Sequence, residues 1–311
     1  MAERINKADF ERLTTLAMSE PGRAHMRPVI QKELPHYDIL YCLDNAGLLD
    51  RLTFQGGTSL RLCHGSPRFS EDLDFVGGRG FNRQQLEPIK DCIEHYIGQR
   101  YGLEVSFREP QELKYEREYA DLKIDKWQIA VTTSPARKDI PRQRIKLVVA
   151  NIDAYSREPQ ALRLNYNFLP DGYADTLVLT ETLDEVMADK LVSLVNTTGY
   201  VRHRDIWDLR WLKQQGAKVR ADWVTNKVHD YRIEDYPNKL TQMSDRLPAI
   251  IEGEVFQREI SRFLPQEVLQ HTLQKPKFSQ HLIAEVSGLL QEVRSSLGTG
   301  PGPGPGPVPT D

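Results

Sequence analysis

The amino-acid sequence predicts an α/β (α+β) fold, in which a mixed β-sheet flanked by helices is followed by a C-terminal helical region. Short segments in the first half alternate apolar and polar residues, which is typical of strands. From about residue 176, apolar residues instead recur at helical spacing. We therefore expect a domain at residues 1–175, a helical domain at 176–297 that completes the functional site, and a disordered Pro/Gly tail at 298–311.

The overall composition limits the class of protein. With 311 residues, 39% hydrophobic and 27% charged, the chain is expected to be soluble and globular. It contains no apolar run of membrane-spanning length and no secretory signal, so we expect no membrane association. Cys42, Cys63 and Cys92 form an odd, sparse set without metal-binding spacing, which indicates reduced thiols in a cytoplasmic protein. The net charge of −3 excludes a strongly basic nucleic-acid binder, and we expect a monomer.

The first fifty residues are expected to be helical and to pack on the sheet. Apolar residues recur there at helical spacing, with a break at Pro21-Gly22. The stretch 52–76 follows, and the chain is organised around it. We expect a short strand at 52–54, a turn at Gly56-Gly57, a helical turn from Thr58, and a second strand at 69–76.

The turn in this stretch has the features of a phosphate-binding site. Two glycines, Gly56 and Gly57, allow the backbone to approach a ligand closely. Thr58 can cap the following helix, whose first N–H groups point at an anion. A tight turn without a ligand is the simpler alternative for this piece alone.

Two carboxylates follow on the second strand. Successive side chains of a strand point to opposite faces, so Asp72 and Asp74 share one face while Leu73 and Phe75 take the other. Like charges held so close raise each other's pKa unless a cation lies between them. A hard divalent ion, bound through a few carboxylates and substrate phosphates, suits such a pair. An edge strand with solvated acids is the alternative, but the order of turn and carboxylates favours a metal–phosphate site.

The segment between residues 77 and 150 is expected to continue the sheet. Apolar spacing predicts a helix at about 86–97 and strands at 103–107, 126–132 and 144–150. A Pro-broken loop at 134–144 is basic, with five cations within residues 137–146. It is either a solvated loop or a surface for RNA phosphates.

A lysine stands out on the first helix of the C-terminal region. Thr182 and Glu185 have the spacing of a capping box, and the helix is expected to run to about Val195. Lys190 falls in the middle of its apolar stripe. Such a lysine either extends to the surface or is held inward as a cation for an anion.

The next helix carries acids on its apolar face. Asp205 and Asp208 share that face with Leu209 and Leu212, at i, i+3, i+4 and i+7. Unpaired charge there is costly, so the pattern predicts a cationic partner.

Residues 54–61 and 68–75 resemble motif I of the AbiEii/AbiGii abortive-infection toxins (type IV toxin–antitoxin, MenT-like), a branch of the nucleotidyltransferases with the DNA polymerase β type of fold. The resemblance implies that Gly57 and Thr58 grip a triphosphate and that Asp72 and Asp74 bind Mg²⁺. Thirteen residues, 59–71, separate the two halves of the motif. The other polar or glycine residues expected to contribute to the nucleotide site are Gly56, Ser59, Arg61 and Ser70.

Two later segments resemble further motifs of this family. Residues 186–191 resemble the lysine-bearing second motif, and residues 204–209 resemble the Arg-Asp-x-x-Asp-Leu motif that follows it. The resemblance implies that Lys190 contacts the nucleotide phosphates and that Asp205 or Asp208 is needed for activity, with Asp208 favoured. It extends over about residues 35–215.

The polymerase β type of fold often carries a third carboxylate on a later strand. The segment 144–150 has no acid at its centre. Asp153, near its end, is a weak candidate, and Asp125 is weaker. The sequence therefore does not identify the group that deprotonates the attacking hydroxyl.

The expected function is Mg²⁺-dependent transfer of a nucleotide from a nucleoside triphosphate (NTP) to an acceptor. RNA is the expected acceptor, and the tRNA 3′ end is the first candidate. The resemblance implies a toxin with a cognate antitoxin, acting in growth control or phage defence. Transfer to a protein or a small molecule is an alternative within the enzyme class. A catalytically silent nucleotide- or RNA-binding module and an interaction protein with structural acids are alternatives outside it. Intact Asp72, Asp74 and Lys190 favour an enzyme.

Overall fold

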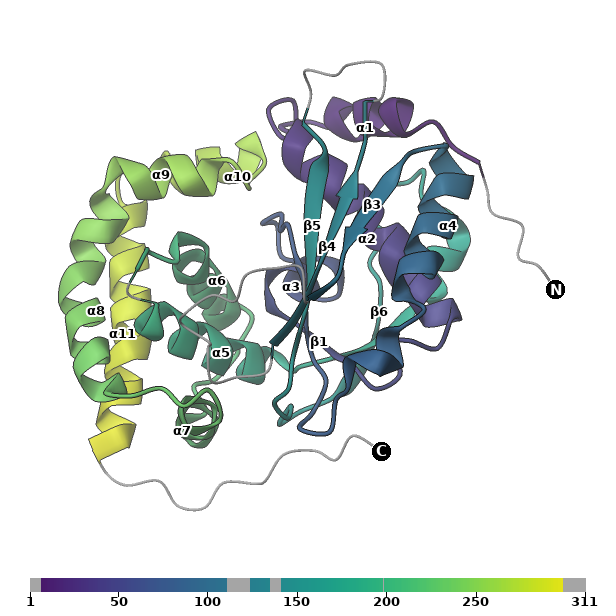
Figure 1. Cartoon of the computed structure of the whole chain (residues 1–311). Helices are drawn as coiled ribbons and strands as arrows, with labels where there is room; N and C mark the ends of the chain where they lie inside the picture. The colour runs from purple at the N-terminus through teal and green to yellow at the C-terminus, as the bar shows by residue number, and fades with distance from the viewer. Residues whose placement is uncertain (1–6, 111–123, 135–140, 198, 299–311) are drawn as a thin grey trace.

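The chain folds into two lobes that lie side by side in Figure 1. The computed structural model describes residues 7–110, 124–134, 141–197 and 199–298. The sheet lobe comprises residues 7–181, and the helical lobe comprises residues 182–298. Residues 299–311 of the predicted disordered tail and residues 135–140 of the predicted basic loop lie outside the described residues.

The sheet lobe is built on a seven-stranded mixed sheet with strand order β3-β4-β5-β2-β1-β7-β6. Strand pairs β1–β7 and β2–β5 are parallel, and the other neighbouring strands pair antiparallel. This arrangement confirms the predicted mixed sheet. The strands are β1 (Thr53–Gln55), β2 (Leu73–Val76), β3 (Val105–Arg108), β4 (Ile124–Val131), β5 (Gln143–Ala150), β6 (Glu158–Ala161) and β7 (Leu177–Thr180).

The other regular secondary structure of the two lobes is helical. In the sheet lobe they are α1 (Phe10–Ser19), α2 (Arg27–Asn45), α3 (Gly56–Leu62) and α4 (Ile89–Tyr101), with short 3-10 turns at Arg83–Leu86 and Asp171–Asp175. In the helical lobe they are α5 (Leu183–Asn196), α6 (His203–Gln214), α7 (Ala221–Asp230), α8 (Tyr236–Glu252), α9 (Glu254–Ser261), α10 (Gln266–His271) and α11 (Phe278–Gly298). Within the described ranges, none of these helices is long and apolar enough to cross a lipid bilayer.

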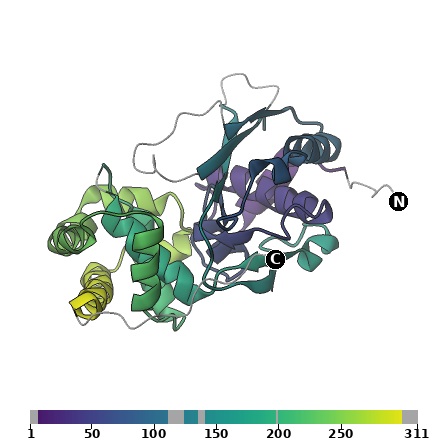
Figure 2. The ribbon, with the colours of Figure 1, turned by 60° about the horizontal axis from the view of Figure 1, so that its bottom comes forward.

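The two faces of the sheet differ in character. On β4 and β5, buried residues such as Trp127 and Leu147 alternate with more exposed ones such as Gln128 and Lys146. The buried set belongs to the core shared with α1, α2 and α4, which lie on one side of the sheet in Figures 1 and 2. The helical lobe lies on the other side in both views. The exposed set of β4 and β5 side chains therefore belongs to this second face of the sheet.

Each lobe has its own main hydrophobic cluster, but each of these clusters also includes residues of the other lobe. Leu60 of α3 belongs to the cluster of the helical lobe, and Phe263, after α9, belongs to the cluster of the sheet lobe. A backbone hydrogen bond of 2.9 Å from the N–H of Phe69 to the carbonyl of Phe263 reinforces the exchange. The two lobes therefore share core contacts as well as a surface. The predicted domain boundary near residue 176 stays a prediction.

Two local predictions need correction. Helix α3 begins at Gly56, not at Thr58, because Gly56 takes a positive φ of 76° that turns the chain directly from β1 into the helix. Thr58 is therefore not a cap, and its hydroxyl donates to the carbonyl of Asp72. Strand β2 covers only Leu73–Val76, so Asp72 precedes it.

The predicted start of α5 is confirmed, but the capping box is not. The hydroxyl of Thr182 accepts the backbone N–H of Glu185 at 3.4 Å, as an N-cap does. The carboxylate of Glu185 does not bond back to the cap. It accepts the backbone N–H groups of Tyr155 and Ser156 at 2.8 and 2.6 Å, and so ties α5 to the sheet lobe.

Candidate active site

A cavity of about 420 Å³ lies where the two lobes meet, and we refer to it as the central cavity. The sheet lobe contributes the turn from β1 into α3 (residues 55–57), the carboxylates at β2 and the open face of β4 and β5. The helical lobe contributes α5, the α5–α6 connection and the start of α6. Of the residues predicted for the site, Gly56, Gly57, Ser70, Asp72, Asp74, Lys190 and Asp205 line this cavity.

The carboxylate wall is held in place by the backbone around it. The backbone N–H of Lys146 donates to Oδ1 of Asp72 at 3.1 Å. A Cβ atom at Gly56 would lie 3.0 Å from Oδ2 of Asp74, so the turn needs glycine both for its positive φ and for this close approach. The turn and the carboxylates are therefore packed as one unit.

The carboxylate of Asp74 is destabilised in its ionised form. Burial is the largest cause and the neighbouring charge of Asp72 is the next, and together they raise the pKa of Asp74 from 3.8 to about 6. Among the residues that the structure describes, no hydrogen bond reaches the side chain of Asp74. Two adjacent carboxylates with free oxygen atoms at a cavity wall fit a hard divalent cation such as Mg²⁺. Asp72 and Asp74 are the residues that would hold it.

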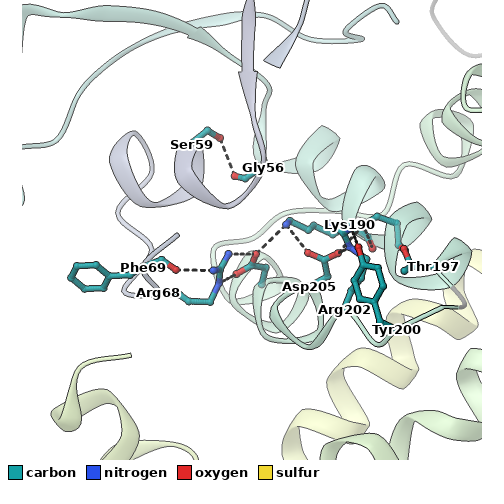
Figure 3. A network of polar contacts seen from close by, with 11 residues as sticks. Gly56, Ser59, Arg68, Phe69, Lys190, Thr197, Tyr200, Arg202 and Asp205 are labelled. Carbon is teal, nitrogen blue, oxygen red and sulfur yellow. Dashed lines mark hydrogen bonds and ion pairs between the residues drawn. The ribbon is translucent and has the colours of Figure 1, made fainter. Parts of the chain in front are cut away.

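Lys190 faces these carboxylates from the helical lobe. Its side chain is 9% exposed, and its Nζ lies 2.7 Å from Oδ1 of Asp205 and 3.2 Å from Oδ2 of Asp208. Figure 3 shows Lys190 and Asp205 pointing toward each other. Of the two alternatives for Lys190, the structure shows the inward one, and the cationic partner predicted for the two aspartates is confirmed, since these groups pair with one another.

Two arginines complete this network, which we call the ion-pair network (Arg68, Lys190, Arg202, Asp205 and Asp208). The guanidinium of Arg68 binds Asp208 in bidentate fashion, at 2.6 and 2.7 Å, with both side chains almost fully buried. Arg202 pairs with Asp205, as Figure 3 shows.

The ion-pair network carries a surplus positive charge. Burial alone would raise the pKa of Asp205, but Arg202 and Lys190 hold that pKa well below its usual range, so this carboxylate stays ionised. Three cations then face two carboxylates, which leaves one positive charge at the cavity wall. An anion bound in the cavity would balance this charge.

Gly57 connects the turn to the ion-pair network. A Cβ atom there would lie 2.4 Å from Nη2 of Arg68 and 2.9 Å from Oγ of Ser70. Glycine is therefore required at this position because the buried guanidinium packs directly against the backbone. The second glycine of the motif thus has a packing role in the folded chain.

Four residues predicted for the site do not line the cavity. Thr58 and Ser59 bond to backbone carbonyls, those of Asp72 and Gly56. Asp208 lies behind the wall, beneath Lys190.

The fourth, Arg61, needs a correction. Its guanidinium forms a bidentate pair with Glu33 of α2, at 2.9 and 3.1 Å, and lies 4.0 Å from the centre of the Phe69 ring. The arginine is buried in the sheet lobe, because α3 turns this side chain toward α2. It is not placed to bind a nucleotide.

Neither candidate for a third carboxylate lies at the cavity. Asp153 pairs with the exposed Arg79 at 3.0 Å. Asp125 is buried on the same face of β4 as Trp127, the face that packs into the core. The acids other than Asp72, Asp74 and Asp205 among the lining residues are Asp189 and Glu259.

One group of three acidic residues in the described ranges has the spacing of metal ligands: Glu181, Glu185 and Asp189. The ammonium of Lys227 already lies among them, 2.9 Å from Glu185, 2.8 Å from Asp189 and 3.5 Å from Glu181. Lys227 is fully buried, and these acids hold its pKa well above the usual value although burial alone would lower it. This group is therefore an ion-pair cluster that anchors α7 to α5.

Several residues of the cavity were not predicted from the sequence. Arg68 stands inside the first motif, four residues before Asp72, so the motif itself was a signal for it. Arg202 and Arg204 flank the start of α6, but charges at a helix start are common. Tyr200 and Lys146 also line the cavity, and the side chain of Tyr200 is 57% exposed. Lys146 is one of the five cations counted within residues 137–146, but no sequence pattern distinguished Tyr200.

Comparison with known proteins gives one family and several similar structures. The family model described as nucleotidyl transferase AbiEii toxin, type IV TA system, matches residues 38–284. MenT4, a nucleotidyltransferase toxin of Mycobacterium tuberculosis, is 17% identical with a TM-score of 0.51, and the match covers 92% of this chain and 89% of that chain. JHP933 of Helicobacter pylori is 16% identical with a TM-score of 0.47, over 87% and 94% of the two chains. No match was found among curated proteins.

Proposed function

This chain belongs to the AbiEii family of nucleotidyltransferase toxins of type IV toxin–antitoxin systems, and we propose on that basis that it transfers a nucleoside monophosphate from an NTP to RNA, with Mg²⁺ bound by Asp72 and Asp74. The tRNA 3′ end is the first acceptor to test. The family implies a cognate antitoxin as a partner, and we expect the enzyme to act in the cytoplasm. The similarity to MenT4 supports the fold of such an enzyme.

The observation that carries the proposal is the opposition of two charged walls across the central cavity. Asp72 and Asp74 lie on the wall from the sheet lobe, and Lys190 and Arg202 lie on the wall from the helical lobe. The oxygen atoms of a triphosphate need cationic partners, and a divalent ion that binds these oxygens also needs carboxylate ligands from the protein. The cavity offers both within about 420 Å³.

The residues suggest how the substrate would be oriented. Lys190 and Arg202 would hold phosphate oxygens, while the backbone at Gly56 allows the nucleotide to come close to Asp74. Tyr200 exposes an aromatic face at the same cavity, on which a base can stack. The acceptor hydroxyl attacks the α-phosphorus, and pyrophosphate leaves. A divalent cation, when bound, supplies charge stabilisation at the phosphoryl oxygens.

The direct test is incubation of the protein with each NTP labelled at the α-phosphate, together with total RNA and Mg²⁺. Label that migrates with RNA of tRNA size on a denaturing gel supports the proposal. Label on a protein or a small molecule would assign another acceptor. No transfer to any acceptor from any NTP would contradict the proposal.

Lys190→Met is expected to weaken NTP binding by roughly one to two orders of magnitude, because a charged phosphate contact contributes about 1.5–3 kcal/mol. The fold should survive, because Asp205 remains paired with Arg202 and Asp208 remains paired with Arg68. Isothermal titration gives the dissociation constants.

A matched control for this variant is Lys213→Met. It removes a lysine of α6 that pairs with Glu285 outside the central cavity. NTP affinities of Lys190→Met and wild type within twofold of each other would remove Lys190 from the site.

Binding of Mg²⁺ is expected to stabilise the protein only above about pH 6. Asp74 has a raised pKa in the folded state, so the metal-free protein loses stability as pH rises from about 3.8 to about 6 and this carboxylate ionises. A divalent cation binds the ionised pair and compensates the repulsion. Melting curves with and without Mg²⁺ should therefore differ at about pH 7.5 and coincide at about pH 5. An equal Mg²⁺ effect at both pH values would contradict this assignment.

A further inference from the structure

A second cavity, of about 870 Å³, adjoins the central one and is strongly basic. We call it the basic groove. It is lined by the start of α2, by β3 and β4, and by the first residues of β5. Its charged lining residues are Arg27, Lys32, Glu71, Arg108, Arg142, Arg144 and Arg262. Six cations thus face one carboxylate, in a chain whose net charge is −3.

The cations are ordered by the sheet. Arg142, Arg144 and Lys146 are alternate residues at β5, so the latter two point to the same exposed face, about 6.7 Å apart along the strand. In the strand register, Lys146 stands opposite Gln128 of β4, and Gln128 stands opposite Arg108 of β3. The groove therefore has a regular row of side chains that can bind hydrogen-bond acceptors.

Carboxylates neutralise only part of this charge. Lys32 lies 2.6 Å from Glu71, and Arg142 lies 3.3 Å from Glu104. Arg27 pairs with Glu11, and Arg262 pairs with Glu259 at 3.0 Å. For Arg108 and Arg144, both exposed, no carboxylate partner is found in the described ranges. Even with each of these pairs counted, two positive charges remain in the groove.

The groove leads to the carboxylates of the central cavity. Lys146 lines that cavity, and its backbone N–H bonds to Asp72. Glu71, the only acid among the groove's lining residues, directly precedes Asp72 and also pairs with Arg204 of the cavity at 3.2 Å. One continuous basic face therefore runs from Arg142 to the carboxylate pair.

We propose that the basic groove binds the phosphate backbone of a single-stranded RNA segment and directs its terminal hydroxyl into the central cavity. This inference rests on the proposed function, since it concerns the acceptor of the same reaction. A polyanionic strand matches a row of cations that ends at the reaction site. An acidic protein surface would also match the positive charge, but binding such a surface would not require the row of cations to end at the reaction site.

The test is RNA binding without NTP, which does not depend on transfer. A fluorescein-labelled oligoribonucleotide of about 12 nucleotides, a typical single-strand site size, is titrated with wild type and with Arg108→Gln/Arg144→Gln. Fluorescence anisotropy should show an affinity lowered on the order of tenfold, and a salt slope reduced by about 1.4, which is the share of two single-strand phosphate contacts. NTP affinity, measured by isothermal titration, should stay unchanged.

Two further variants make the result specific. Arg246→Gln/Arg294→Gln removes two exposed arginines of α8 and α11, outside both cavities, and should bind RNA as wild type does. Arg108→Lys/Arg144→Lys keeps the charge and should recover most of the affinity. Unchanged RNA binding by the Arg108→Gln/Arg144→Gln variant would overturn the groove assignment and favour an acidic protein as its ligand. Failure of wild type to transfer nucleotides would instead count against the proposed function, and the binding result would stand separately.

Discussion

Asp74→Asn is expected to abolish nucleotidyl transfer and, at the same time, to stabilise the metal-free protein at neutral pH. The substitution keeps the shape of the side chain but removes a charge that a divalent cation requires. We expect a loss of activity on the order of a hundredfold to a thousandfold, or more. The stability gain follows from the raised pKa of about 6, because wild type must ionise a carboxyl that its surroundings disfavour.

The measurements for Asp74→Asn are transfer of labelled nucleotide and the melting temperature at about pH 7.5 without Mg²⁺. Asp153→Asn is the matched control, since this acid pairs with Arg79 away from the cavity. It should keep its activity and show no gain in stability. A folded Asp72→Asn/Asp74→Asn double variant with wild-type activity or toxicity would refute the assignment of the metal site.

Arg68→Met is expected to cause the largest loss of stability among single changes in the site. It leaves Asp208 buried with Lys190, at 3.2 Å, as its remaining ionic partner. Breaking a buried pair in this way costs about 3–5 kcal/mol, which corresponds to a fall in melting temperature of roughly 5–8 °C for a chain of this length. Thermal unfolding at pH 7 measures the effect.

A double-mutant cycle separates the charge from the packing. Arg68→Met/Asp208→Leu replaces the pair by apolar side chains, so it should regain much of the stability lost in Arg68→Met. Arg79→Met serves as the control, because it removes an exposed arginine that also joins the lobes, through Asp230 at 3.0 Å. That change should cost less than about 1 kcal/mol. Equal losses for Arg68→Met and Arg79→Met would show that Asp208 does not depend on its buried arginine.

The helical part of the site was predictable because its signals are local. Lys190 interrupts the apolar stripe of one helix, and Asp205 and Asp208 interrupt that of the next. A charge on a buried face must find a partner, and only a short connection separates these two helices. Periodicity alone therefore indicated that the two aspartates need a cationic partner, although it left the direction of Lys190 open.

The contacts between the lobes were not predictable in this way. Arg68 and Asp208 are 140 residues apart, and no pattern within either segment indicates that they pair. Arg61 was assigned to the nucleotide site because it stands in the first motif. Its true partner, Glu33, lies in a helix that gave no sign of chemistry. Proximity in sequence to the first motif therefore gave the wrong assignment for Arg61, because the direction of this side chain depends on tertiary packing.

The exchange of Leu60 and Phe263 between the two hydrophobic clusters has a consequence for synthesis of the toxin. Lys190 and Asp208 follow Asp74 by more than a hundred residues, and Phe263 follows later still. At about 5–20 residues per second, a ribosome needs roughly 5–25 s to add the second wall after the first. During that interval the nascent chain has its carboxylate pair but lacks Lys190 and Arg202, the residues proposed to hold the triphosphate. The cell that makes this protein is therefore not exposed to its activity until the helical lobe has emerged.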